Sequence, residues 1–195
     1  MNPQELYGFW FGGGNLRDKA YLDGRMGMWF AKNEKMDAEM RGRFAPWLEK
    51  DLSAWKAADR DLLCLIVLYD QIPRNSFRGT GRMFAYDDKA RGLAREAVAR
   101  GLQRSFTVAE SLFIALPFEH SEDRADQDES IRLCEELLAR AAPAEKGFAQ
   151  GTLDYAEKHR VIIRRFGRFP HRNALLGRRS TPEEVAFLKG PDSSF

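Results

Sequence analysis

The residues Leu62-Leu63-Cys64-Leu65-Ile66-Val67-Leu68 are all apolar and lie within a helical pattern over about residues 57–70. A helix at the surface carries a polar face, and this stretch has none, which is typical of a helix buried on all sides. Each large side chain buried there contributes about 1.5–3 kcal/mol, so this helix is predicted to form the packing core. With Tyr69 the apolar run is eight residues long. That is far short of the roughly 18 residues of a membrane-spanning helix.

The segments outward from this helix also space their apolar residues at the 3.6-residue period of helices. No alternating apolar pattern between turn residues predicts a strand. Three helix starts, at Asn2, Thr107 and Thr181, have a capping side chain followed three positions later by a carboxylate. The sequence therefore predicts an all-α protein of about eight to ten helices without significant sheet. The expected helices begin at Pro3 and then cover about residues 34–44, 57–70, 87–100 up to Gly101, 107–116 up to Pro117, 124–141 and 148–166 up to Gly167, with a short last helix from Thr181.

Length and composition limit the class of protein. The chain has 195 residues, of which 44% are hydrophobic and 31% charged, so residues 1–195 are expected to form a single helical domain rather than a disordered chain. Lys and Arg number 31 against 29 for Asp and Glu, too balanced for binding nucleic acid or anionic lipid through bulk charge. Cys64 and Cys134 lie in apolar patterns without metal spacing, which predicts buried thiols, no disulfide and a cytoplasmic protein.

Charge is segregated along the chain despite this balance. The stretch 158–182 holds one lysine, seven arginines and no acid, whereas the stretch 119–136 holds eight acids against two arginines. The two stretches either face each other or are solvated surfaces, or else the arginines bind carboxylate or phosphate. Nucleic-acid binding through 158–182 is the less favoured interpretation, because it needs exposed arginines interleaved with accessible aromatic side chains.

A second arginine-rich segment follows the central helix. Between Asp70 and Asp87 the chain has three arginines and no acid, and Pro73 together with two glycines predicts a connection rather than one continuous helix. An aspartate at the end of an apolar helix needs a partner, since an unpaired buried charge costs several kcal/mol. Asp70 is therefore expected to pair with Arg74 or with an arginine near the C-terminus. The pair either fixes the turn or orients arginines that hold an anionic ligand.

The chain has three histidines. His159 shares an inward helical stripe with Ala156 and Ile163, as a core histidine would, whereas His120 lies just beyond a helix end and His171 follows Pro170. Their spacing is not that of a zinc site, so no metal is predicted. A carboxylate that orients an imidazole would instead make an acid-base pair. No phosphate-binding loop, dinucleotide fingerprint or nucleophile elbow is present, and no cofactor is predicted.

Long polar motifs carry a resemblance to a known family. They are Asp70-Gln71-x-Pro73-Arg74-Asn75-x-x-Arg78-Gly79-Thr80, Pro117-Phe118-Glu119-His120-Ser121-Glu122-Asp123 and Arg165-Phe166-Gly167-Arg168-Phe169-Pro170-His171-Arg172-Asn173. With these motifs the chain resembles the bacterial family called domain of unknown function 924, from Trp29 to Leu188. The resemblance implies an all-helical array similar to tetratricopeptide-repeat superhelices, and it implies no reaction.

These motifs are polar and follow helix ends, which favours a site over a scaffold. We expect them to meet in a cleft between the central and C-terminal helices and to bind a small anionic molecule; whether a reaction follows is left open. His120 or His159 with Glu119 would transfer protons. The alternative is a concave helical surface that binds an acidic peptide. The residues expected to bind the ligand are Asp70, Gln71, Arg74, Asn75, Arg78, Arg168, His171, Arg172 and Asn173.

Overall fold

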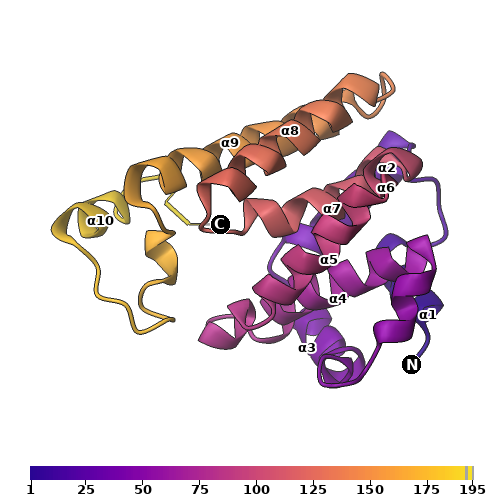
Figure 1. The fold of residues 1–195 in the computed structure, drawn as a ribbon, viewed down its shortest axis with the longest axis horizontal. Coiled ribbons are helices and arrows are strands. Elements are labelled where there is room, and N and C mark those ends of the chain that lie inside the picture. Colours follow the sequence, from indigo (N-terminus) through magenta and orange to yellow (C-terminus); the bar gives the residue numbers. More distant parts are fainter. Residues whose placement is uncertain (192, 195) are drawn as a thin grey trace.

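Helices form the regular structure of residues 1–191, 193 and 194, the part of the chain that this computed structural model describes. No strand occurs in that part, so the all-α prediction is confirmed (Figure 1). The α-helices are α1 (Pro3–Phe11), α2 (Lys19–Phe30), α3 (Glu34–Arg43), α4 (Asp59–Ser76), α5 (Asp87–Ala99), α6 (Leu102–Ser105), α7 (Val108–Glu119), α8 (Arg124–Arg140), α9 (Lys146–Phe166) and α10 (Pro182–Phe187). Short 3-10 helices are η1 (Ala45–Trp47), η2 (Ser53–Ala57), η3 (Gly81–Phe84) and η4 (Pro170–Arg172).

Helix α4 is the centre of the N-terminal part of the molecule. Every residue of the stretch 62–69 is buried, and α4 contacts α1, α3, α5 and α7. Such burial on all sides is what an apolar helix without a polar face requires. The predicted packing role of this helix is confirmed.

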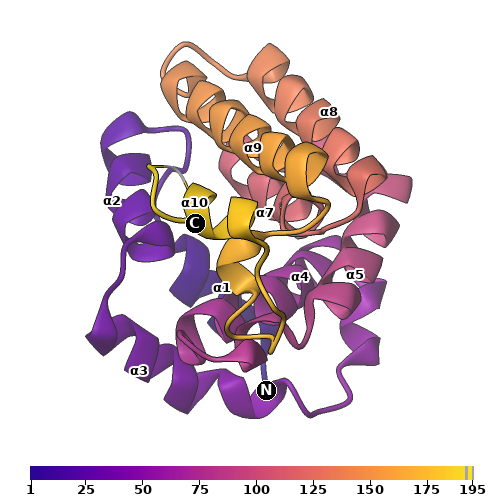
Figure 2. The same ribbon diagram turned by 90° about the vertical axis from the view of Figure 1, so that its left-hand side faces the viewer.

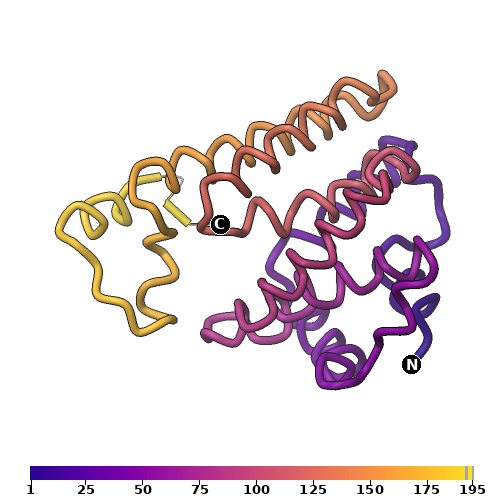
Figure 3. Tube along the Cα trace, viewed as in Figure 1, coloured from indigo at the N-terminus to yellow at the C-terminus, as the bar shows by residue number. Residues whose placement is uncertain are grey.

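Helices α8 and α9 form a long antiparallel pair beside that body (Figures 1 and 3). After α9, the segment 167–181 turns back toward the N-terminal helices before α10 begins, as the turned view shows (Figure 2). A small separate cluster of buried Ile162, Ile163 and Phe169 packs with Phe166 and Phe187 beneath α10. The C-terminal part thus has its own apolar support and returns toward the end of α4. No helix of the described residues is both long and apolar enough to cross a membrane.

The predicted capped helix starts are confirmed, but the short helix α6 and the longer α2 were not predicted, and α4 and α7 end later than predicted. Asn2, Thr107 and Thr181 each cap a helix with the side chain. Helix α2 was not predicted, since only two of its residues are buried and it contains two glycines. Helices α4 and α7 also run through their prolines, to Ser76 and Glu119. A proline near a helix end removes one hydrogen bond, and burial of both last turns offsets that loss.

Gly81, at the start of η3, lies against the returning C-terminal segment. A Cβ atom at Gly81 would be 2.7 Å from the carbonyl oxygen of Leu175, a backbone atom that cannot rotate away. We expect Gly81→Ala to lower the free energy of unfolding by about 1–3 kcal/mol, the usual cost of an overpacked contact. The matched control is Gly92→Ala within α5, where a Cβ meets nothing within 4 Å and alanine is expected to stabilise by roughly 0.5–1 kcal/mol. Equal unfolding midpoints in urea for the two variants would contradict this contact.

Candidate functional site

Asp70 and His120 form the centre of the site. Asp70 lies near the end of α4 and is 1% exposed, and His120 is the C-cap residue of α7. The Nδ1 atom of His120 is 2.7 Å from Oδ1 of Asp70, and the Nε2 group of Gln71 donates to Oδ2 at 2.6 Å. Helix α7 brings His120 to this position only because it continues past Pro117. Residues far apart in the sequence thus meet in one hydrogen-bonded pair.

The two groups have opposite protonation preferences. Burial alone would raise the pKa of Asp70, but attraction to His120 and Arg74 and the hydrogen bonds from His120 and Gln71 lower it to about 2. Burial and the neighbouring Arg74 lower the pKa of His120, and its attraction to Asp70 only partly opposes them. At neutral pH the pair is therefore a carboxylate and a neutral imidazole. Because the carboxylate can only accept, His120 carries its hydrogen on Nδ1 and leaves the Nε2 lone pair free to accept a proton.

Arg74 links this pair to α5. Its guanidinium donates to both carboxylate oxygens of Asp87, at 2.8 and 3.0 Å, and to the carbonyl oxygen of Asp70 at 2.7 Å. Its Nη1 atom is also 3.3 Å from Oδ1 of Asp70. Bidentate pairing of this kind fixes orientation as well as charge. Arg74 is thus neutralised by two resident carboxylates and positions Asp70.

Arg172, in η4, approaches the same group from the C-terminal segment. Its guanidinium carbon lies 4.6 Å from the ring centroid of Phe84 and 4.4 Å from that of Phe169. The carboxylate that pairs with it belongs to Asp87, whose Oδ2 is 3.6 Å from Nη1 of Arg172 and already accepts from Arg74. Its Nε atom is buried and has no hydrogen-bond partner among the described residues. Burial and repulsion from Arg74 lower the pKa of Arg172 to about 10, so it stays charged and only partly compensated.

Glu119 and His159 form a second, deeper pair. Both residues are buried, and Nδ1 of His159 lies 3.3 Å from Oε1 of Glu119 and 2.8 Å from the carbonyl oxygen of Tyr155. Burial, together with repulsion from Asp70, raises the pKa of Glu119 to about 8. Burial lowers the pKa of His159 to about 3. Both groups are therefore uncharged at neutral pH, in an interior that disfavours charge.

All three histidines of the chain lie in this region. The ring centroids of His120 and His159 are 6.3 Å apart, and the ring of Phe169 lies 5.5 Å from His159 and 5.6 Å from His171. Burial and the charge of Arg172 lower the pKa of His171 to about 4. The predicted convergence of Asp70, Gln71, Arg74, Glu119, His120, His159, His171 and Arg172 is thus present in the structure.

Four other predicted ligand-binding residues form their hydrogen bonds outside this group: Asn75, Arg78, Arg168 and Asn173. Arg78 donates to both oxygens of Asp37, at 2.9 and 3.2 Å, and to Oδ1 of Asn75 at 2.6 Å. Arg168 pairs with Glu184, whose Oε2 also accepts from Nδ2 of Asn173 at 3.3 Å. These contacts hold α3 to α4, and α10 to the segment that precedes it. They are internal supports rather than free anion-binding groups.

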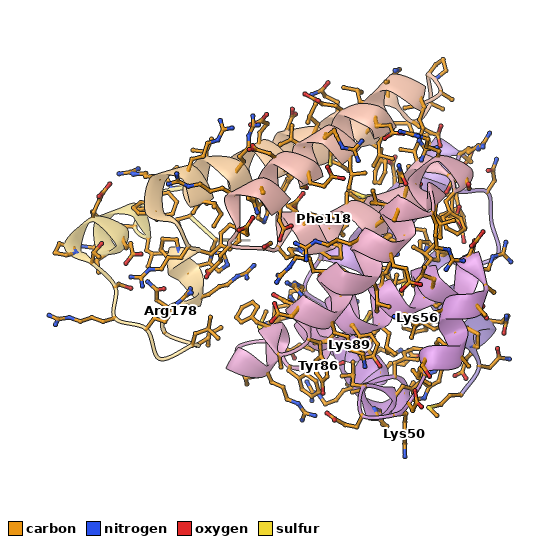
Figure 4. All side chains as sticks on the ribbon, in the orientation of Figure 1. Lys50, Lys56, Tyr86, Lys89, Phe118 and Arg178 are labelled. Atoms are coloured by element: carbon orange, nitrogen blue, oxygen red, sulfur yellow. The ribbon has the colours of Figure 1, made fainter. Side chains whose placement is uncertain are left out.

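The acidic and basic stretches face each other only in part, since several of their residues, such as Asp126 and Arg168, form ion pairs outside both stretches. Asp128 on α8 pairs with Arg160 and Arg164 on α9, at 3.3 and 3.1 Å. Glu122 accepts two hydrogen bonds from Arg178 and one from the backbone N–H of Phe169. Figure 4 labels Arg178 on the segment after α9 and Phe118 near the end of α7. This contact ties η4, and hence Arg172, to the end of α7.

The structure adds four residues to the predicted site: Asp87, Glu122, Phe84 and Phe169. Asp87 had a signal, since it closes the acid-free segment after Asp70, but a single aspartate does not show which arginine it pairs with. Glu122 lies within the polar motif that contains His120. Phe169 lies within the polar motif that contains Arg172. Phe84 gave no signal, because contacts across the fold leave no spacing in the sequence. Among the described residues no group of three His, Cys, Asp or Glu side chains is placed to hold a metal ion.

Comparisons with known proteins place this chain in a family. A family model described as "Bacterial protein of unknown function (DUF924)" matches residues 6–192. The solved structure of a protein of unknown function from Agrobacterium tumefaciens is 34% identical, with a TM-score of 0.79 over 96% of this chain and 97% of that one. No curated protein matches. The match covers the segments that carry Asp70, His120 and Arg172, and the chain belongs to the DUF924 family of bacterial proteins of unknown function.

Proposed function

We propose that this protein binds a small anion, a phosphate or a carboxylate, at Arg172, with His120 beside it as a proton acceptor. The proposal rests on the burial and the incomplete pairing of Arg172. It is buried between two aromatic rings, its Nε group has no hydrogen-bond partner in the described chain, and it shares one carboxylate with Arg74. A buried donor left unpaired costs about 1–3 kcal/mol. An anion that accepts from this group would recover that energy.

The Asp70–His120 pair supports a chemical role for the same site. A carboxylate that holds Nδ1–H leaves Nε2 in a fixed direction, the arrangement by which enzymes orient a general base. His120 is 14% exposed, whereas Asp70 behind it is 1% exposed, so the imidazole is the member of the pair that a ligand can reach. In the proposed chemistry, Nε2 of His120 accepts a proton from the bound phosphate or carboxylate compound. Asp70, Gln71 and Arg74 are the positioning residues.

The neutral pair of Glu119 and His159 supports the same proposal from behind the site. Protonated Glu119 lies next to neutral His159, whose ring is 6.3 Å from that of His120. Because both groups are uncharged at neutral pH, Glu119 does not act as a further negative charge near Arg172. The positive charge of Arg172 is therefore available to an anion. We also place this function in the cytoplasm, a setting that agrees with two buried free cysteines.

Nuclear magnetic resonance of the arginine Nε–H groups tests anion binding directly. We expect inorganic phosphate or malonate to shift the Arg172 Nε–H resonance saturably in the wild-type protein. In Arg172→Gln, where binding is followed by the His120 Nε2 resonance instead, the Kd is expected to rise at least about tenfold, since hydrogen bonds to charged groups contribute about 1.5–3 kcal/mol. The matched control is Arg164→Gln, at an exposed arginine that pairs with Asp128, with less than a twofold change. An unchanged Kd in Arg172→Gln, or no saturable shift with either anion, contradicts the proposal.

A further inference from the structure

A small pocket with an apolar floor and a charged rim lies on another face of α4, away from His120. It has a volume of about 130 Å³ and is lined by residues of α4, α5 and the segment around η2. Several water molecules or one small organic acid would fill such a space. Tyr69 of α4 faces this pocket, whereas its neighbour Asp70 faces His120. None of the contacts described for the His120 site involves its lining.

The floor of this pocket is apolar. Leu52, Leu65 and Leu93 line it and are buried. Tyr69, which is 1% exposed, completes the floor, with its ring 5.8 Å from that of Tyr86. The hydroxyl of Tyr69 is buried and has no hydrogen-bond partner within residues 1–191, 193 and 194. A buried tyrosine hydroxyl usually has a partner, so this group points to a ligand acceptor.

The rim of the pocket is positively charged. Lys50 and Lys89 form no ion pair in the described part of the chain, and Nζ of Lys89 lies 3.8 Å from the ring centroid of Tyr69. Lys56 also lines the pocket but is paired with Glu96 at 3.0 Å. The acid on the rim, Asp51, accepts a hydrogen bond from the backbone N–H of Ser53. Figure 4 shows Lys50, Lys56 and Lys89 on the same part of the molecule.

We propose that this pocket binds a small monocarboxylate with a compact apolar body. The leucine floor takes the apolar body, Lys50 and Lys89 attract the carboxylate, and the hydroxyl of Tyr69 donates to it. Inorganic phosphate lacks the apolar body, and a neutral aromatic alcohol lacks the charge. Neither satisfies both parts of the lining, and this distinguishes the pocket from the anion site at Arg172.

Benzoate is the probe, measured by calorimetry and by backbone amide shifts on the full chain. The Arg172→Gln variant serves as background, so that a carboxylate bound at Arg172 does not contribute. We expect saturable benzoate binding that moves amides near Leu65 and Leu93 but not near His120, with benzyl alcohol and inorganic phosphate each at least about tenfold weaker. Tyr69→Phe keeps the ring and removes the hydroxyl, and it is expected to weaken benzoate about tenfold.

Lysine variants separate this pocket from general surface charge. Lys89→Gln is expected to weaken benzoate about threefold, in line with a charge at an exposed rim. Lys35→Gln, at an exposed lysine of α3 away from the pocket, is expected to leave the Kd unchanged. The inference is overturned if benzoate does not bind, if Tyr69→Phe binds it as tightly as the background protein, or if benzyl alcohol or phosphate binds equally well. These outcomes are independent of phosphate binding at Arg172 in the wild-type protein.

Discussion

Asp70→Ala is expected to lower the free energy of unfolding by about 3–5 kcal/mol, the usual cost of breaking a buried charge pair. The carboxylate is 1% exposed and is the acceptor for both His120 and Gln71. Without it, Arg74 keeps Asp87 but loses one of its two compensating acids, and the His120 N–H group is left without its acceptor. Urea unfolding followed by circular dichroism measures the change.

Two further variants make this test specific. Asp154→Ala removes an exposed aspartate from α9 and is expected to change stability by no more than roughly 0.5 kcal/mol. Asp70→Asn keeps the shape but loses the charge, so it is expected to fall between the wild type and Asp70→Ala. A loss below about 1 kcal/mol in Asp70→Ala, with an unchanged denaturant slope, would show that the buried network is not maintained in solution.

Glu119→Gln is expected to remove the loss of stability that the wild type suffers above neutral pH. Folding raises the pKa of Glu119 from 4.5 to about 8, mainly through burial, so the folded state holds a proton that the unfolded chain has already released. Stability that depends on this proton is fully present below the unfolded pKa and is lost as pH rises toward 8. Between pH 6.5 and 8 this amounts to about 2 kcal/mol, at 1.36 kcal/mol per pH unit.

The histidines act in the opposite direction at lower pH. Folding lowers the pKa of His159 from 6.5 to about 3 and that of His171 from 6.5 to about 4, and it also lowers that of His120. The unfolded chain therefore binds more protons than the folded protein below pH 6.5. In that range, the free energy of unfolding decreases as the pH is lowered. The wild type is expected to be most stable near pH 6.5.

The comparison of variants isolates Glu119. Glu119→Gln, which mimics the protonated carboxyl group, is expected to keep the decrease below pH 6.5 and to lose the decrease above it. Glu135→Gln, at an exposed glutamate of α8, is expected to retain both. Unfolding free energies measured from pH 5 to 8.5 decide the matter. A wild-type curve that is flat between pH 6.5 and 8 would mean that Glu119 is ionised in the folded protein.

Much of the fold follows from local sequence rules. The apolar stretch 62–68 predicts a central helix, and the capping patterns at Asn2, Thr107 and Thr181 predict helix starts, because both depend on residues close together in the chain. The central helix was predicted to end at about residue 70 and the later one before Pro117. Both continue further, to Ser76 and Glu119, since burial of the following turns outweighs one lost hydrogen bond. The arrangement similar to tetratricopeptide repeats stays a prediction.

The sequence predicted only part of the membership of the candidate site, and it did not predict how the members pair. Polar motifs after helix ends indicated Asp70, His120 and Arg172, yet all the arginines looked equally available. The structure separates them, because Asp37 and Glu184 lie far away in sequence and neutralise Arg78 and Arg168. Which acid meets which arginine depends on how the helices pack, and spacing along one helix does not contain that information.

The histidine side-chain ¹H–¹⁵N spectrum at pH 7 tests the central claim most directly, because all three histidines of the chain lie at the site. We expect three neutral imidazoles, with His120 carrying its hydrogen on Nδ1 and with its Nε2 resonance moving when phosphate is added. The Nε2 shift is expected to be lost in Arg172→Gln. Together these results describe a neutral base that Asp70 orients beside an anion-binding Arg172. This assignment would be contradicted if His120 is protonated at pH 7, if its hydrogen lies on Nε2, or if its Nε2 resonance does not move when phosphate is added.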